Sequence, residues 1–200
     1  MMSEIVPQQT SGNPTNNVAI VDLNEPREAR DHYQTARARL LDVNHWGDMS
    51  GFLSASFQLL DHEGKVVRNR LPQTGDYFRI KVPAPSPLND YDWVRVEQID
   101  EINEGELQMT AIRVRPSSDP LSPDTETDHF FSSEATSSFI VKREGSRVMA
   151  AVHGRNEQPN ISETDSIGGE IRNAIVATGA ILGLSDLQWD KLVKGLLKLR

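Results

Sequence analysis

The 200-residue sequence contains no cysteine. This absence excludes disulfide bonds, thiolate metal ligands and a cysteine nucleophile together. The first residues lack the basic start and apolar core of a signal peptide, and no apolar stretch reaches the length of a membrane span. We therefore expect a soluble, cytoplasmic protein that does not use a membrane.

An excess of positive charge is also missing, since the formal net charge is −8. Nucleic-acid binding needs clustered Lys and Arg against the phosphates, so this charge argues against a nucleic-acid partner. The best local exception is the predicted outward strand face, because aromatic rings beside arginines can stack on bases. Its residues are Tyr77, Arg79, Lys81, Trp93 and Arg95, with Arg113 and Arg115 as further candidates. The same pattern is typical of the solvent face of a half-buried sheet, and the overall acidity favours that interpretation.

The motifs of common catalytic chemistries are absent from the sequence. There is no phosphate-binding glycine motif and no GxSxG, and the five histidines stand singly, without the close pairs that zinc sites usually show. The acidic pair Asp90 and Asp92 resembles solvated loop charges rather than a general acid and base. We expect no cofactor and no metal, and the sequence favours a binding protein over an enzyme.

The hydrophobic pattern changes along the chain. Residues 1–17 are polar and are predicted to form a disordered tail, with residues 18–200 as a single domain. Residues 18–23 predict a short strand, and residues 26–41 a surface helix whose apolar positions recur every three or four residues. Further strands are predicted at residues 54–60, 76–82, 93–99, 107–115, 135–143 and 147–153, with the clearest alternation at 76–82. Gly105 and Gly145, each between two of these strands, predict hairpin turns.

The C-terminal part predicts two helices. The first covers residues 167–182 and ends at Gly183, a C-cap residue; the second begins at Ser185, where Gln188 completes a capping box. An antiparallel sheet with an apolar face needs a cover, and these helices supply it. The predicted fold is therefore α+β: about six antiparallel strands covered by a C-terminal helical segment, with an N-terminal helix assisting. The alternative is a small β-barrel over residues 54–115 followed by a separate helical unit.

The stretch NHWGDMSG, residues 44–51, groups an imidazole, an indole and a carboxylate beside two glycines. Trp46 can plug the end of a core while Gly47 turns the chain and Asp48 or Ser50 caps amides. His45 could serve as a base, but no partner is adjacent in sequence. We interpret the stretch as a corner between a helix and a sheet and keep His45 as a candidate.

The order of these elements resembles the START/polyketide-cyclase-like (helix-grip, SRPBCC) superfamily. The similar features are the strand at 18–23, the helix at 26–41, His45 and Trp46 in the connector, the strands from 54 to 153 and the helix from 167. In that superfamily the sheet wraps a terminal helix and leaves an apolar cavity between them.

The resemblance implies a protein that holds an apolar small molecule in this cavity. Inward strand residues would line it together with residues of the terminal helix, and aromatic rings would stand at its mouth. The implied ligand-binding residues are His45, Trp46, Tyr91, Trp93, His153, Ile171, Ile175 and Thr178. The alternative is a protein-interaction or oligomerisation module, in which the amphipathic segment 187–199 docks into a partner or forms a homodimer.

Overall fold

The computed structural model describes residues 5–51, 54–82, 91–123, 126–127, 129–160 and 186–199. Its described part contains one antiparallel sheet of seven strands in the order β1-β7-β6-β5-β4-β3-β2. The strands are β1 (Asn13–Asp22), β2 (Ser56–Leu60), β3 (Tyr77–Lys81), β4 (Asp92–Glu104), β5 (Leu107–Pro116), β6 (Thr136–Glu144) and β7 (Arg147–Glu157). This confirms the predicted α+β class, with seven strands where about six were expected.

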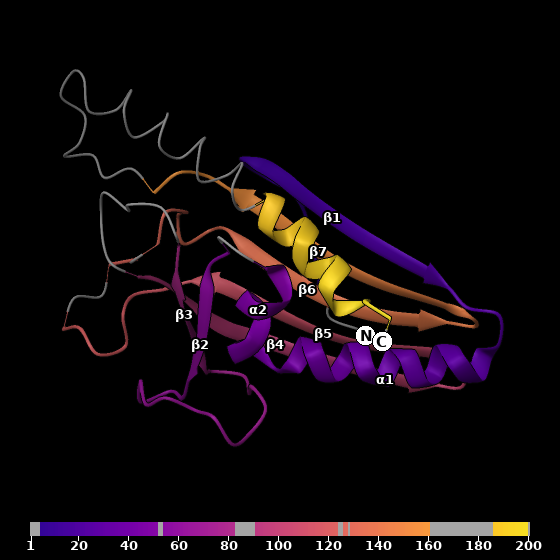
Figure 1. Ribbon diagram of the computed structural model, residues 1–200. Coiled ribbons are helices and arrows are strands. Elements are labelled where there is room, and N and C mark those ends of the chain that lie inside the picture. The colour runs from indigo at the N-terminus through magenta and orange to yellow at the C-terminus, as the bar shows by residue number, and fades with distance from the viewer. Residues whose placement is uncertain are drawn as a thin grey trace.

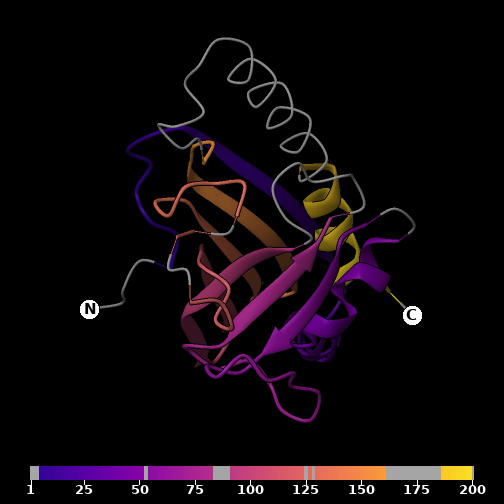
Figure 2. The ribbon, with the colours of Figure 1, turned by 90° about the vertical axis from the view of Figure 1, so that its left-hand side faces the viewer.

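The helices share one face of the sheet, which we call the inner face. They are α1 (Pro26–Leu41), the short η1 (Val43–His45), α2 (Trp46–Ser50) and a C-terminal helix over residues 186–196. In Figure 1 the long α1 and the C-terminal helix both lie against the curved sheet, and Figure 2 shows the sheet curling around that helix. Because β1 and β2 are its two edges, the sheet is open, and the alternative of a closed barrel with a separate helical unit is not what the structure has.

The main core lies between the inner face and the helices. On α1, the buried positions Ala29, Tyr33, Ala36 and Leu40 form the predicted apolar stripe, at spacings of three and four residues. The C-terminal helix buries its own apolar face in the same core, through Leu192, Val193, Leu196 and Leu197. The preceding helix predicted at 167–182, with Gly183 and Ser185, lies outside the described residues.

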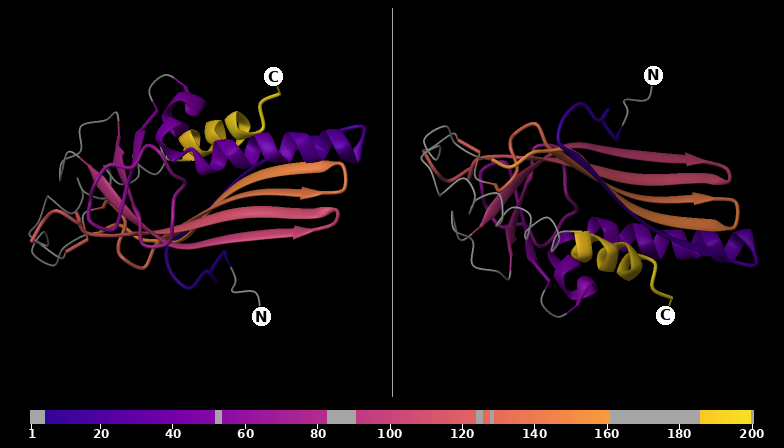
Figure 3. Two further views of the ribbon diagram at one scale, coloured as in Figure 1. Left: turned by 90° about the horizontal axis from the view of Figure 1, so that it is seen from below. Right: turned by 90° about the horizontal axis from the view of Figure 1, so that it is seen from above.

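The N-terminal segment differs from the predicted disordered tail. β1 begins at Asn13, and residues 5–12 lie on the outer face, opposite the helices (Figure 3). Ser138 Oγ donates to Ile5 O at 2.7 Å, and Asn156 Oδ1 accepts from the backbone N of Thr10 at 2.7 Å. Ile5 and Val6 pack against Ala111, Ile140 and Ala151. The polar composition of this segment did not predict its position on the sheet. The segment has little apolar surface of its own and is held mainly by hydrogen bonds to the sheet.

Arg143 joins the two hairpins that the glycine turns predicted. Gly105 and Gly145 both have φ of +59°, where the turns need a residue free of Cβ strain. The fully buried guanidinium of Arg143 donates to Gly105 O at 2.8 Å, to Gly145 O at 2.7 Å and to Gln108 Oε1 at 2.7 Å. One side chain therefore fixes the β4–β5 and β6–β7 turns relative to each other.

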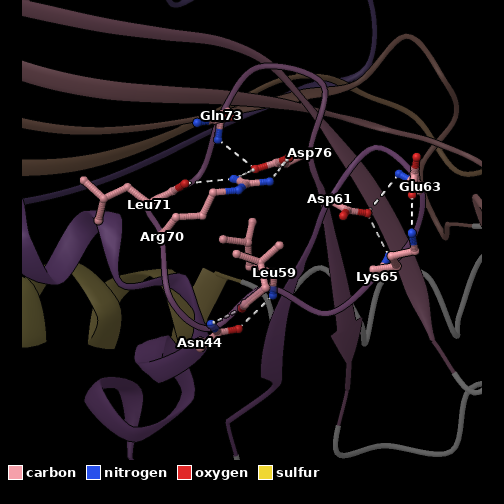
Figure 4. Close-up of polar contacts among 10 residues, drawn as sticks. Asn44, Leu59, Asp61, Glu63, Lys65, Arg70, Leu71, Gln73 and Asp76 are labelled. Carbon is pink, nitrogen blue, oxygen red and sulfur yellow. Dashed lines mark hydrogen bonds and ion pairs between the residues drawn. The ribbon is translucent and has the colours of Figure 1, made fainter.

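The long connection between β2 and β3 is held by polar side chains (Figure 4). Asn44 of η1 accepts from Leu59 N at 2.8 Å and donates to Val67 O at 3.0 Å. Further along, Arg70 binds the carboxylate of Asp76 through both terminal nitrogens, at 2.6 and 2.9 Å. Asn44 thus has a structural role, because it fastens the start of this connection to the helical corner.

Candidate functional site

A cavity of about 50 Å³ lies on the inner face, between β2–β6 and the beginning of the C-terminal helix. Its described lining is mostly apolar and includes several aromatic side chains. Pockets for small molecules usually measure about 300–1,000 Å³. In this conformation the cavity therefore encloses one small chemical group rather than a whole ligand.

Aromatic rings from five elements converge on this cavity. The Trp46 ring, completely buried at the start of α2, has its centroid 4.6 Å from that of Phe139, 5.5 Å from that of Phe57 and 5.7 Å from that of Phe78. Trp189 of the C-terminal helix completes the set, 5.2 Å from Phe139 in a T-shaped arrangement. Such edge-to-face packing is the favoured geometry of aromatic pairs.

The orientation of the Trp46 ring is fixed by a hydrogen bond. Its Nε1 donates to Leu40 O at 3.1 Å, at the end of α1. This bond satisfies the polar atom of a buried indole and leaves the rest of the ring as an apolar wall.

Gln188 brings an amide group to the cavity. Its Oε1 accepts from Ala55 N at 3.0 Å. Ala55 is buried just before the edge strand β2, where its N–H needs an acceptor. The predicted capping box pairs Gln188 with Ser185, which lies outside the described residues. The other amide atom, Nε2, is buried and has no hydrogen-bond partner in the described part of the chain.

His129 and Asp92 add two further polar groups to the lining. His129 Nδ1 accepts from Phe131 N at 2.9 Å, and Asp92 Oδ1 accepts from Phe130 N at 3.1 Å. Complete burial lowers the pKa of His129 to about 3, so its imidazole is neutral. Because Nδ1 is an acceptor, the ring proton is on Nε2, which is therefore a donor.

Of the residues predicted to bind a ligand, Trp46 is the one placed in the described lining. His45 is exposed, and its Nδ1 lies 2.8 Å from Asp42 Oδ1, a contact that raises the pKa of the imidazole. Ile171, Ile175 and Thr178 lie outside the described residues.

Three other predicted residues lie on the outer face. Tyr91 and Trp93 flank Asp92, whose side chain is in the lining, and alternation along the strand turns both rings the other way. His153 shares the outer face with Ala151, and its Nδ1 lies 2.8 Å from Asn16 Oδ1. Burial and the nearby Arg155 lower the pKa of His153. Ligand binding by these residues, and by His45, stays a prediction.

The corner at residues 44–51 is helical, and its glycines have other roles than expected. Gly47 lies inside α2, where a Cβ would come within 2.8 Å of Ala55 O, so it allows α2 to approach the sheet closely. Gly51, with φ of +84°, is the residue that turns the chain. Ser50 Oγ donates to the carbonyl of Trp46 rather than capping an amide.

Apart from Trp46, sequence reasoning missed the rings and the polar groups that line the cavity. The run His129-Phe130-Phe131 is the densest aromatic segment of the chain and could have indicated the site. Gln188 drew attention only as a helix cap. The rings of Phe57, Phe78 and Phe139 alternate in ordinary strand patterns, so periodicity alone placed them in a core and not around a cavity.

The outer face shows how the possible nucleic-acid platform is arranged. The Arg79 guanidinium carbon lies 4.5 Å from the ring centroid of Tyr91 and 6.0 Å from that of Trp93. Arg113 and Arg115 both form ion pairs with Glu97. The rings are therefore stacked by the chain's own cation, and two of the arginines share an acidic partner.

Two further features bear on the function classes. Among the described residues, no group of three or more His, Asp or Glu side chains is arranged to hold a metal ion. No helix in that part of the chain combines the length and the apolar character needed to cross a membrane.

Comparisons with known proteins do not assign the chain to a family. No family model matches the chain, and no curated protein matches its sequence significantly. Similar solved structures include hypothetical protein jhp0584 from Helicobacter pylori, with a TM-score of 0.45, 13% identity and coverage of 92% of this chain and 87% of that one. Ara h 8.0201 has a TM-score of 0.36, 10% identity and coverage of 90% and 99%. Major latex-like protein 151 from Panax ginseng has a TM-score of 0.35, 10% identity and coverage of 88% and 97%. Similarity at this level does not assign the chain to a family.

Proposed function

We propose that the chain is a helix-grip protein that binds a small, largely apolar molecule at the aromatic cavity of its inner face, without catalysing a reaction. The observation that carries this proposal is the convergence of Trp46, Phe57, Phe78, Phe139 and Trp189 around one cavity. Protein interiors are normally packed without such cavities, because the side chains that line a void lose van der Waals contacts. A cavity walled by rings and supplied with a few polar groups is typical of a ligand site.

The size of the cavity restricts how a ligand is held. About 50 Å³ has room for a methyl-sized group or a few water molecules. A larger ligand inserts one apolar end and displaces part of the wall. Trp189 and Phe130 are the aromatic wall residues best able to move, because both are partly exposed whereas Trp46 and Phe139 are buried.

The proposal is tested by native mass spectrometry of protein purified under mild conditions, compared with the denatured mass. Ala55 lines the cavity and is 2% exposed, so Ala55→Leu fills the space with an apolar side chain. We expect the wild type to carry a small extra mass that is lost on denaturation, and Ala55→Leu to lack it. The same extra mass on both proteins, or bare chains in both, would count against the proposal.

The alternative function, docking through the C-terminal helix, has less support. Of the apolar stripe that a partner would contact, Leu192, Val193 and Leu196 are completely buried in the chain's own core. Trp189 is partly exposed and Leu199 is exposed. Docking through the whole stripe would have to expose the three buried residues first.

A further inference from the structure

Gln188 presents an unused hydrogen-bond donor at the cavity. Its amide orientation is set by the bond from Ala55 N to Oε1, which leaves the two N–H groups of Nε2 on the other side of the amide. Gln188 is 9% exposed, and Nε2 has no partner among the described residues. A buried donor without an acceptor is unfavourable, so a ligand that brings an acceptor to this donor would gain binding free energy.

His129 supplies a second donor from a different part of the chain. Its Nδ1 is occupied by Phe131 N, and its ring is held by stacking on Phe130, with centroids 4.3 Å apart. The remaining Nε2–H belongs to a side chain of the same lining. The described lining therefore contains one donor without a partner, Gln188 Nε2, and a neutral imidazole, His129, whose donor atom is Nε2.

The described lining contains no Lys or Arg, and its one ionisable acid is Asp92. A carboxylate or phosphate ligand would find no cation among these described residues and would lie near the carboxyl group of Asp92. Burying such an anion without a partner is strongly unfavourable.

We infer that this site selects neutral molecules whose apolar end carries a hydrogen-bond acceptor, such as a ketone or ester carbonyl, and that Gln188 and His129 recognise the acceptor. This inference rests on the proposed function, and it adds the chemical class of the ligand.

The test uses three probes that share one ring. Acetophenone carries a carbonyl, isopropylbenzene has a similar size with a methyl group in place of the oxygen, and benzoate is an anion. Titrations are followed through the indole N–H signals of Trp46 and Trp189 in NMR spectra of the full chain. Gln188→Met keeps the length of the side chain and removes the donor. We expect this variant to bind acetophenone about ten-fold more weakly than the wild type, a loss of about 1.4 kcal/mol in binding free energy. Its affinity for isopropylbenzene should change by less than about two-fold.

Isopropylbenzene also shows whether the variant keeps its cavity. If Gln188→Met binds neither probe, the same comparison is made with His129→Asn, which keeps an acceptor for Phe131 N and loses the imidazole donor. Equal effects on both probes, or no effect on acetophenone in either variant, would overturn the inference and leave the proposed function standing. Benzoate binding more tightly than acetophenone would also overturn it. If neither ring probe binds the wild type, the proposed function itself fails.

Discussion

Arg39 of α1 binds the carboxyl end of the C-terminal helix: its Nη1 lies 2.9 Å from Leu196 O and 2.7 Å from Lys198 O. The last carbonyls of a helix have no partner within the helix and carry partial negative charge. Arg39 therefore caps that end from a neighbouring element and holds in place the helix that supplies Gln188 and Trp189.

We expect Arg39→Met to lower the free energy of unfolding by about 1–2 kcal/mol, because charge-assisted bonds to several carbonyls are lost. Urea denaturation measures the change. Arg37→Met is the matched control: Arg37 pairs with the exposed Glu101, and a surface pair contributes at most about 1 kcal/mol. An equal loss in both variants would contradict the capping role.

Replacing Arg143 tests how much the stability of the two hairpins depends on this one buried cation. Arg143→Met retains much of the stem and leaves Gly105 O and Gly145 O without this donor. We expect a loss of about 2–4 kcal/mol, since truncating one side of a buried charged network leaves its partners unsatisfied. Lys142→Met, one residue away and pointing to the outer face, should change stability by less than about 0.5 kcal/mol. A loss under about 1 kcal/mol for Arg143→Met would show that the turns hold without it.

The burial of His129 makes the free energy of unfolding decrease as the pH falls. Its pKa in the folded chain is about 3, against an ordinary value of 6.5, because burial disfavours the charged ring. The unfolded chain therefore takes up the proton first, and acid favours unfolding. The stabilising contribution of the neutral ring is complete above 6.5 and falls by about 1.4 kcal/mol per pH unit between 6.5 and 3.

The measurement is the free energy of unfolding of the wild type and of His129→Asn at about pH 7.5 and about pH 5. Between these conditions the wild type should lose about 2 kcal/mol more than the variant. Taking the difference between the two proteins cancels the titration of all other groups. Parallel changes would mean that His129 is hydrated in the folded chain.

Much of the architecture followed from local patterns. The stripe on α1, the alternation in β3 and the turns at Gly105 and Gly145 are each set by residues close in sequence, so periodicity and turn chemistry predicted them. The N-terminal segment was missed because it is held by distant partners, such as Asn156 and Ser138.

The site was harder to predict than the fold. Trp46 was expected at the cavity because an indole after a helix is a conspicuous feature. Gln188 and His129 reach the same cavity from segments far apart in the chain, and which face each one takes depends on tertiary packing. Tyr91 and Trp93 lie on the outer face because Asp92, between them in sequence, takes the inner one.

The three tryptophans allow the most direct test of the ligand site. Trp46 and Trp189 line the cavity, and Trp93 lies on the outer face. The measurement is a titration of the wild type with isopropylbenzene, followed by the three indole N–H signals, each assigned by a Trp→Phe variant. We predict saturable shifts for Trp46 and Trp189, no shift for Trp93, and loss of the response in Ala55→Leu. Shifts confined to Trp93, or none at any of the three, would contradict a binding site on the inner face.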